Sequence, residues 1–489
     1  MWRRGRIFVA AALILGANGA FAQEPPLPVG LGGAISSDAE ASEAEATGDE
    51  EPALPAGLGR PQGGGLSDKT SKRSSRRGSD DRRSGHGPVV ELAPLTGFLE
   101  GRVGPRLRGD AHQGAFSLAE ARLRLETEAA FGAVALRVVG DGVFDSVVKD
   151  RTPDLETGEG AFDLRELNIV WRPTDFADLK VGRQVLTWGV GDLIFINDLF
   201  PKDFQSFFIG RDAEYLKAPS DAARLSLFND VVNVDLVYTP RFDPDRFING
   251  SRLSYFNPVA GVIVGRNAVL EPETPDDWFN DDEFAARAYR QVGAFEAALY
   301  GYIGYFKGPT GLNASGAFFF PRLRVYGASA RGPFAGGIVT AEFGRYISAD
   351  DPDGSNPAIP NGSIRYLAGF EREIAQNFTA SIQYYGETRT DHAAFVAAAP
   401  PGGAAQRTRH LTTLRLTRQA FNQNLTLSLL NFWSPNEYDG HVRLRASYKV
   451  DDAWLVEGGG NFFYGPRNDA LFSQLKDNTN LFVAVRRSF

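Results

Sequence analysis

The chain has 489 residues, no cysteine and a formal net charge of −8. This length suits two or three soluble domains or one large barrel, the missing cysteines exclude disulfides and thiolate metal sites, and the acidic balance argues against a nucleic-acid binder. The longest apolar run, Ile7 to Ala17, is too short to cross a membrane as a helix. A transmembrane β-barrel is compatible with this, because only alternate residues of its strands meet lipid.

The N-terminus carries the features of an export signal. Three arginines precede the apolar run, and Ala20-Phe21-Ala22 follows it in the pattern of an A-x-A cleavage site. We therefore expect residues 1–22 to be a signal peptide and the mature chain to begin at Gln23.

Residues 23–95 have the composition of a disordered arm. Residues 38–51 hold seven acids and no base, and residues 69–83 hold seven bases. Such a segment cannot bury enough apolar surface to offset its ordering entropy. The word E-P-x-L-P-x-G-L-G occurs at 24–32 and again at 51–59. The two copies are either short ligands for a periplasmic partner or low-complexity drift.

From Thr96 to Phe489 the residue pattern changes to alternating apolar and polar residues. The stretch Leu118 to Phe131 is the clearest, with Leu123 and Leu125 on one face and the charged residues on the other. A period of two residues is that of a strand with one apolar face, and it fits a helix badly.

Short turns and long polar connections alternate along residues 96–489, which predicts paired strands. Eight short turns give eight hairpins, and one strand is left over at each end, so we expect about 18 strands, with 16 as the alternative. We place the turns near Phe131-Gly132, Pro173–Phe176, Asn229-Asp230, Val292-Gly293, Gly332-Pro333, Ile374-Ala375, Gln419–Asn422 and Asp451-Asp452. This is the layout of an all-β, up-and-down antiparallel transmembrane barrel with short periplasmic turns and long extracellular loops.

Charged residues at alternate strand positions are expected to face a wet lumen. The candidates for lining the pore are Glu120, Arg122, Arg124, Glu126, Arg322, Arg324, Arg443, Arg445, Lys449 and Arg486. In the last nine strands the inward bases outnumber the inward acids by eight to four on this reading, which favours anions. A mixed lining without preference is the alternative. Aromatic residues near strand ends, Tyr346 and Phe432 among them, are expected to form interface girdles.

The connection after the fifth expected strand is too apolar for a solvent loop. It runs from Gly182-Arg183-Gln184 through Trp188-Gly189 to Phe204. We expect it to fold against the wall or into the lumen, as a constriction or as a substrate site. Its candidate residues are Trp188, Asp192, Asp198, Lys202 and Asp203. The G-R-Q…W-G pattern resembles one found in porin-like and alginate-export-like outer-membrane barrels.

Nothing in the sequence predicts an enzyme, a cofactor or a metal site. The five histidines stand in no motif of a hydrolase. The acidic loop Glu271 to Glu283 matches no calcium-binding spacing, and we expect it to be a solvated extracellular face.

The last strand, Asn478 to Phe489, has one apolar and one polar face and ends the printed chain on phenylalanine. Its apolar face carries Leu481, Val483, Val485 and Phe489. This strand resembles the C-terminal strand of Gram-negative outer-membrane β-barrels, although Arg487 departs from the pattern. The resemblance implies recognition by the barrel-assembly machinery, insertion among outer-membrane lipid and lipopolysaccharide, and an N-terminal arm in the periplasm.

Two functions follow as hypotheses. The first is an outer-membrane channel for small hydrophilic solutes or ions, with a lean toward anions, because a barrel of this size leaves a water-filled interior. The second is an export pore for a polymer that works with periplasmic partners, which would give the arm at 23–95 a use.

Overall fold

The computed structural model describes residues 90–399 and 406–489. The expected signal peptide and almost all of the expected disordered arm, with both copies of its repeated word, lie outside the described residues. Within those residues, no helix is long and apolar enough to cross a bilayer.

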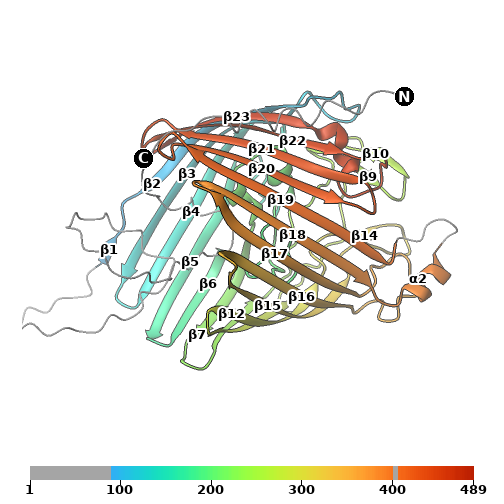
Figure 1. The fold of residues 1–489 in the computed structure, drawn as a ribbon, viewed down its shortest axis with the longest axis horizontal. Coiled ribbons are helices and arrows are strands. Elements are labelled where there is room, and N and C mark those ends of the chain that lie inside the picture. The colour runs from blue at the N-terminus through green and yellow to red at the C-terminus, as the bar shows by residue number, and fades with distance from the viewer. Residues whose placement is uncertain (1–89, 400–405) are drawn as a thin grey trace, which may run out of the picture. The chain divides into compact units, whose positions relative to one another are not determined.

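The described chain forms one closed, up-and-down antiparallel β-barrel (Figure 1). Its eighteen strands are β2 (Thr96–Pro105), β3 (Phe116–Phe131), β4 (Val134–Asp145), β5 (Phe162–Thr174), β6 (Ala177–Val185), β7 (Pro219–Leu227), β8 (Asn233–Thr239), β11 (Glu283–Val292), β12 (Phe295–Tyr305), β15 (Arg322–Phe334), β16 (Gly337–Ser348), β17 (Ser363–Ala375), β18 (Phe378–Arg389), β19 (Thr408–Ala420), β20 (Leu425–Ser434), β21 (Asp439–Lys449), β22 (Trp454–Tyr464) and β23 (Asn480–Ser488). The prediction of 18 strands is confirmed. A further short strand, β1 (Val90–Leu92), pairs with the turn end of β3.

The barrel closes where its first and last strands meet. β23 pairs with β22 on one side and with β2 on the other, as the sequence predicted. Beyond the last ladder pair, the N–H of Phe489 donates to the carbonyl of Gly97, and the N–H of Gly97 donates back to Phe489, both at 3.0 Å. The terminal residue therefore completes the seam with its backbone.

All eight predicted turns lie within about three residues of the observed ones. The turn placed at Ile374-Ala375 comes about two residues early, because β17 continues to Ala375. The turn placed at Gly332-Pro333 comes about three residues early, because β15 continues through both residues to Phe334. The chain reverses instead at Ala335 and Gly336, whose φ angles are +49° and +72°. Pro333 is tolerated because it lies at the end of the strand, where little of the ladder remains to be completed.

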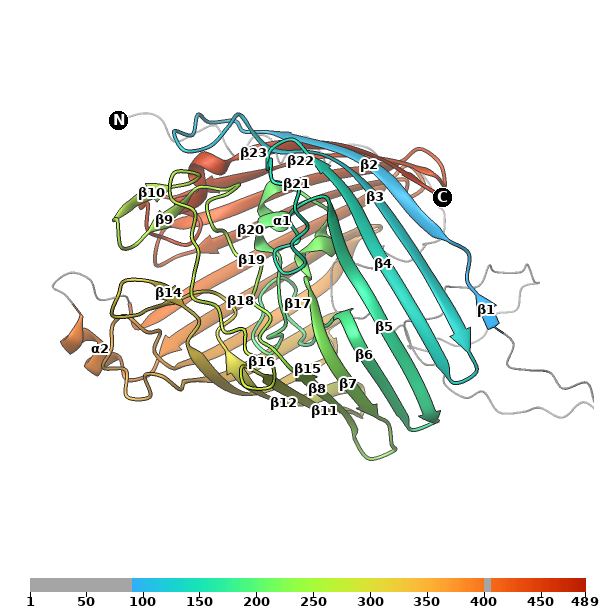
Figure 2. The ribbon, with the colours of Figure 1, turned by 180° about the vertical axis from the view of Figure 1, so that it is seen from behind.

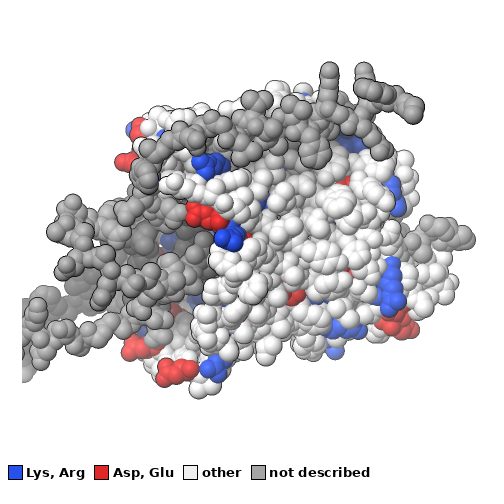
Figure 3. Space-filling model, in the orientation of Figure 1, with Lys and Arg blue, Asp and Glu red and all other residues white. Residues whose placement is uncertain are grey.

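The outer face of the wall is apolar in its middle. Leu123 and Leu125 face outward on β3, and Glu120 and Arg122 on the same strand are buried inside. Figure 3 shows a broad uncharged wall with charged side chains toward its two ends. This arrangement is what a hydrocarbon layer requires.

Two expected girdle residues point the other way. Tyr346 and Phe432 are buried inside the barrel and belong to its interior apolar cluster. Their faces were misassigned because an aromatic residue on a barrel strand was taken to mark the interface, whereas here the lumen itself contains apolar structure.

The remaining elements are short and belong to the connections. They are the helices α1 (Phe204–Ile209), η2 (Ala213–Leu216), α2 (His392–Ala398) and η3 (Ser473–Asn478), and the hairpins β9 (Tyr255–Asn257) with β10 (Val262–Val264) and β13 (Gly311–Leu312) with β14 (Phe318–Phe319). Seen from behind, α1 lies inside the ring of strands (Figure 2).

Candidate functional site: a segment folded into the lumen

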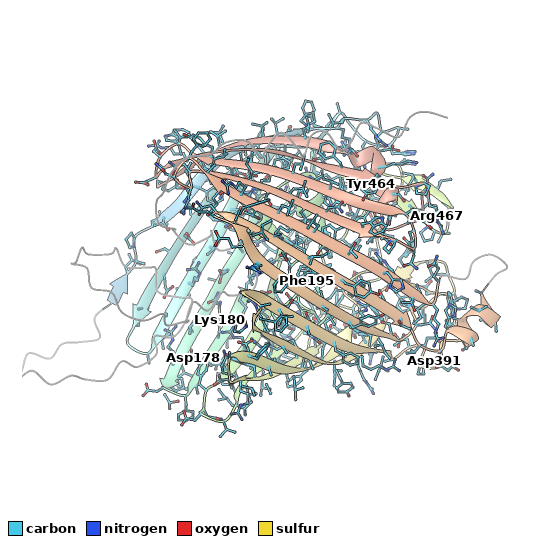
Figure 4. All side chains as sticks on the ribbon, viewed as in Figure 1. Asp178, Lys180, Phe195, Asp391, Tyr464 and Arg467 are labelled. Atoms are coloured by element: carbon cyan, nitrogen blue, oxygen red, sulfur yellow. The ribbon has the colours of Figure 1, made fainter. Side chains whose placement is uncertain are left out.

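The connection between β6 and β7, residues 186–218, folds into the barrel; we call it the in-folded segment. Its apolar residues Ile194, Ile196 and Phe200 are buried against inward side chains of the wall. The wall residues in this cluster come from strands all around the barrel, among them Val237, Tyr302, Leu323, Tyr385, Leu430 and Phe463. Phe195 lies near the middle of the barrel in Figure 4 and packs partly buried against the same cluster. The segment therefore crosses the lumen.

Glu342 on β16 holds the first part of the in-folded segment. Its carboxylate accepts hydrogen bonds from the backbone N–H of Asn197 at 2.8 Å and from the Asn197 amide at 2.9 Å. The N–H groups of Gly191 and Val190 donate to the same carboxylate at 3.2 and 3.4 Å. One wall carboxylate thus satisfies four donors that would otherwise be buried without partners.

Gly327 on β15 allows the segment to approach the wall closely. A Cβ at this position would lie 1.7 Å from Oδ1 of Asn197. The adjacent strand β12 carries Gly301, where a Cβ would meet nothing within 4 Å. Glycine is therefore required at 327 for packing and is not required at 301.

The predicted constriction residues all lie on or beside this segment. The Trp188 ring meets the Phe200 ring edge-on, with centroids 4.8 Å apart. Asp192 pairs with Arg415 of β19 at 2.8 Å. Burial raises the pKa of Asp192, and the Arg415 guanidinium opposes this only in part.

Three of these residues serve the internal architecture of the segment. Lys202 pairs with Asp198 at 2.9 Å, and both side chains are buried. Asp203 caps α1 by accepting from the N–H of Ser206 at 2.7 Å. They brace the segment rather than offer free charges to a solute.

Around α1 and η2, charged side chains of the wall form hydrogen bonds and ion pairs with the second half of the segment. Arg102 of β2 donates to the carbonyl of Gly210 at 2.6 Å, and Arg443 of β21 donates to that of Arg211 at 2.8 Å. Arg124 pairs with Glu214 at 2.7 Å. We call this set, with Asp212 and its partners below, the charged cluster.

Asp212 is the acidic centre of the charged cluster. Arg445 and Arg486 pair with it at 3.2 and 3.3 Å. Burial alone would raise the pKa of Asp212, but these guanidiniums outweigh it and hold that pKa well below its usual range. Asp212 was not among the predicted site residues, because nothing in a loop sequence shows which wall arginines it will meet.

Beside the charged cluster, β3 and β4 carry fully buried ion pairs. Arg122 pairs with Asp141 at 2.8 Å and lies 4.4 Å from the centroid of the Tyr215 ring. Removing one partner of such a pair typically costs about 3–5 kcal/mol, because the other charge stays buried. Arg122 and Glu120 face the lumen as predicted, but they are covered by the segment.

Toward the short turns, charged side chains on the lumen side are partly exposed to water; we call this part of the lumen the turn-end vestibule. Its wall carries Glu126 and Arg137, with side chains 38% and 36% exposed and 3.3 Å apart. Lys180 pairs with Glu166 at 3.4 Å on β6 and β5 (Figure 4). By alternation along β21, Lys449 also faces this side, near its turn end. Water reaches charged groups here without crossing the segment.

Arg322 and Arg324 do not face the lumen, which corrects the prediction. They alternate with Leu323 and Val325, which are buried against the interior cluster. The register was assigned one residue out, because the apolar pair was taken for the lipid face. In this barrel those apolar residues pack on the in-folded segment instead.

At the long-loop end, a small polar hollow, open to solvent, lies between the β4–β5 connection and α1. Arg252, Arg211 and Gln205 are among its lining residues. In the β8–β11 connection, Asp243 is buried and Asp245 is half-buried, and desolvation raises the pKa of each to about 6. This acidic pair was also missed, since its loop gave no pattern beyond polarity.

In the described residues, no group of three or more His, Cys, Asp or Glu is arranged to hold a metal ion. Glu283, the last acid of the acidic loop, begins β11 and pairs with Lys307 at 2.7 Å.

No protein-family model and no curated protein sequence matches the chain. Among solved structures, it is similar to the BenF-like porin of Pseudomonas fluorescens Pf-5, with 10% identity over 81% of this chain and 98% of that one and a TM-score of 0.49. It is also similar to OccK3 (OpdO) of Pseudomonas aeruginosa, with 14% identity over 81% and 95% and a TM-score of 0.47, and to OccD3 (OpdP) of the same organism, with 12% identity over 83% and 92% and a TM-score of 0.46.

The closed sheet and the apolar outer wall of this chain identify the type of β-structure it forms. Eighteen antiparallel strands close on themselves, and the outer wall is apolar in its middle. A closed antiparallel sheet with such a wall is the only β-structure that satisfies its backbone within lipid. The chain therefore forms a closed, eighteen-strand antiparallel β-barrel of the transmembrane type.

Proposed function

We propose that the protein is a channel for small hydrophilic solutes, narrowed by the in-folded segment. The observation that carries the proposal is the combination of a charged, water-exposed turn-end vestibule with a segment that crosses an otherwise wide lumen. An eighteen-strand barrel without such a segment leaves an aqueous pore. The segment therefore sets the size limit of the channel, and the charged cluster forms one side of the restricted path.

The polar hollow at the long-loop end supports the proposal from the other side. Asp145 and Arg252 form an ion pair at its edge, and both line it. Solvated polar surface thus exists on both sides of the segment. For a solute that enters at the long loops and leaves at the short turns, the in-folded segment is then the restriction along the path through the lumen.

We propose further that the channel prefers anions modestly. Without Arg322 and Arg324, the strands β15–β23 still place Arg365, Arg415, Arg443, Arg445, Lys449 and Arg486 on the lumen side, against Glu342, Glu371, Glu387 and Glu457. Alternation adds Arg331 and Arg409 to the basic side. The carboxylates of β2–β5 offset part of this excess of positive charge, so the preference for anions is expected to be small.

Planar-bilayer recording on the purified protein tests both statements. Stable current steps are expected, with a reversal potential of anion sign across a potassium chloride gradient. Uptake of uncharged sugars of increasing size into proteoliposomes is expected to fall off at a small cut-off. Absence of conductance and of uptake from correctly inserted barrels would refute the channel, and a reversal potential of cation sign would refute only the anion preference.

A polymer export pore predicts a different result in the same recording. Such a pore is closed until a partner is added or the segment is removed. No contact among the described residues favours it over the channel, and the arm on which it rests lies outside them.

A further inference from the structure

Three arginines face outward near the long-loop end of β15 and β16; we call Arg322, Arg324 and Arg345 the rim patch. Residues directly opposite each other in an antiparallel ladder share a face. Arg324 lies opposite Ile303, whose side is the outer wall, since Ile303 is 53% exposed. Arg345 lies opposite Tyr326, which is 56% exposed on the same wall.

The rim patch carries positive charge without matching carboxylates. Among the described residues, none of its three side chains forms an ion pair; the guanidinium of Arg322 lies 5.7 Å from the centroid of the Tyr305 ring. Two carboxylates lie at this rim: Asp350 accepts from the backbone N–H of Arg322, and Asp281 accepts from the hydroxyl of Tyr305. Nη1 of Arg345 is buried and has no hydrogen-bond partner within the described chain.

The depth of the patch is set by the aromatic girdle. Tyr326, Tyr366 and Tyr384 face outward on β15, β17 and β18, and the Tyr384 hydroxyl contacts His410 at 2.6 Å. Arg345 is level with Tyr326 in the ladder. At about 3.3 Å per residue, Arg324 and Arg322 lie roughly 7 and 13 Å further along the strand, toward the loops. The patch begins at the girdle and extends into the headgroup region.

An arginine on the lipid face destabilises the barrel by an amount that depends on its depth. The destabilisation is about 2–4 kcal/mol at the bilayer centre and falls to about 0–1 kcal/mol near the interface. Three of them on two neighbouring strands repel each other unless an anion lies between them. Guanidinium binds phosphate through two parallel hydrogen bonds, which makes phosphate the anion that fits.

We propose that the rim patch binds the phosphorylated sugar headgroup of a lipid A-type glycolipid in the outer leaflet. Long loops of such barrels face the cell exterior, so this rim meets the outer leaflet. The acyl chains would lie on the apolar wall beside the patch, over Ile303, Ile347 and Ile364. The site lies on the lipid face, so it is independent of what passes through the lumen.

The opposite rim supplies a matched control. Arg290, Arg372 and Arg487 are exposed near the short turns of β11, β17 and β23, and alternation places them on the outer wall. These arginines face the inner leaflet. Replacing three of them removes the same charge from the same face at the other end of the barrel.

The test is native mass spectrometry of the full-length protein, extracted in detergent, stripped of lipid and titrated with bisphosphorylated lipid A. The R322Q/R324Q/R345Q variant is expected to bind at least about tenfold more weakly than the parent protein, since three charge-assisted contacts are lost. The R290Q/R372Q/R487Q variant is expected to bind as the parent does. Dephosphorylated lipid A is expected to bind weakly to all three proteins.

Four results would overturn the proposal. They are unchanged binding by the rim-patch variant, an equal loss in the control variant, equal binding of dephosphorylated lipid A, and binding of phosphatidylglycerol that depends equally on the three arginines. Heat-modifiable mobility shows that each variant is folded. If the triple variant does not fold, R324Q alone is compared with R290Q, with a smaller loss expected in the former only.

Discussion

Asp192 and Arg415 lie 2.8 Å apart and join the in-folded segment to β19, across the lumen from the β6 strand where the segment starts. Glu342 holds the same stretch from β16. The segment is therefore attached at both sides of the lumen, and under the proposed channel function these attachments are expected to set the resistance of the pore.

The Asp192–Arg415 pair makes an asymmetric prediction. Burial raises the pKa of Asp192, which lowers the cost of removing its charge, so Asp192→Asn is expected to disturb the segment less than the loss of Arg415 does. Arg415→Gln leaves the carboxylate buried without its partner, which is the costlier change. Single-channel traces should show more frequent current fluctuations in R415Q than in D192N. Equal noise in the two variants would argue against a braced segment.

Gly327 and Gly301 form a second matched pair. Gly327→Ala puts a methyl group where Oδ1 of Asn197 lies, and Gly301→Ala puts one in open space on the neighbouring strand. The first is expected to displace the segment and change the single-channel conductance by a large fraction, and the second to leave it as in the parent. Identical conductance in both would mean that the segment does not pack on β15.

Asp243 and Asp245 give the β8–β11 connection a pH dependence. Their pKa values of about 6 lie above the value of about 3.9 for an unfolded aspartate. A raised pKa contributes stability that is complete below about pH 4 and is lost as the pH rises through about 6. The groups facing them are Lys202, Lys307, Asp198 and Glu283.

Hydrogen exchange measures this effect. After correction for intrinsic rates, amides of residues 240–254 should exchange more slowly at pH 5 than at pH 8. In Asp245→Asn the difference should shrink, because one of the two titrating groups is gone. Faster exchange at pH 5, or the same difference in the variant, would contradict the assignment.

Phe489 is predicted to matter for assembly more than for conduction. Its backbone makes two hydrogen bonds to Gly97, which are lost when the residue is deleted and kept in Phe489→Ala. The deletion should lower the yield of heat-modifiable, protease-resistant barrel, and the molecules that do assemble should conduct normally. A deletion variant that assembles with the yield of the parent protein would contradict the predicted role of Phe489 in assembly.

The strand pattern of this chain could be predicted because turns and alternation are local. The lumen face of β3 and the pairing of β23 with β2 followed from the period of two and from the leftover strands at the ends. The turn at Ala335-Gly336 was placed about three residues early, since alanine rarely takes a positive φ and the nearby Gly332-Pro333 is the stronger turn signal.

The prediction of which residues of β15 and β16 face the lumen was wrong for a different reason. The rule that apolar residues face lipid holds only where the lumen is wet. Leu323 and Tyr346 are inward and apolar because the in-folded segment covers them, and that contact joins residues more than a hundred positions apart. The apolar character of residues 186–204 was the one local sign of it, and it indicated the segment but not its partners.

The most direct test of the constriction is the single-channel conductance of the protein with residues 190–200 replaced by a short glycine-serine linker. The account predicts a conductance several-fold above that of the parent, since the wide lumen of an eighteen-strand barrel is then unobstructed. A replaced variant that inserts normally and conducts no more than the parent would contradict the claim that this segment sets the size of the path.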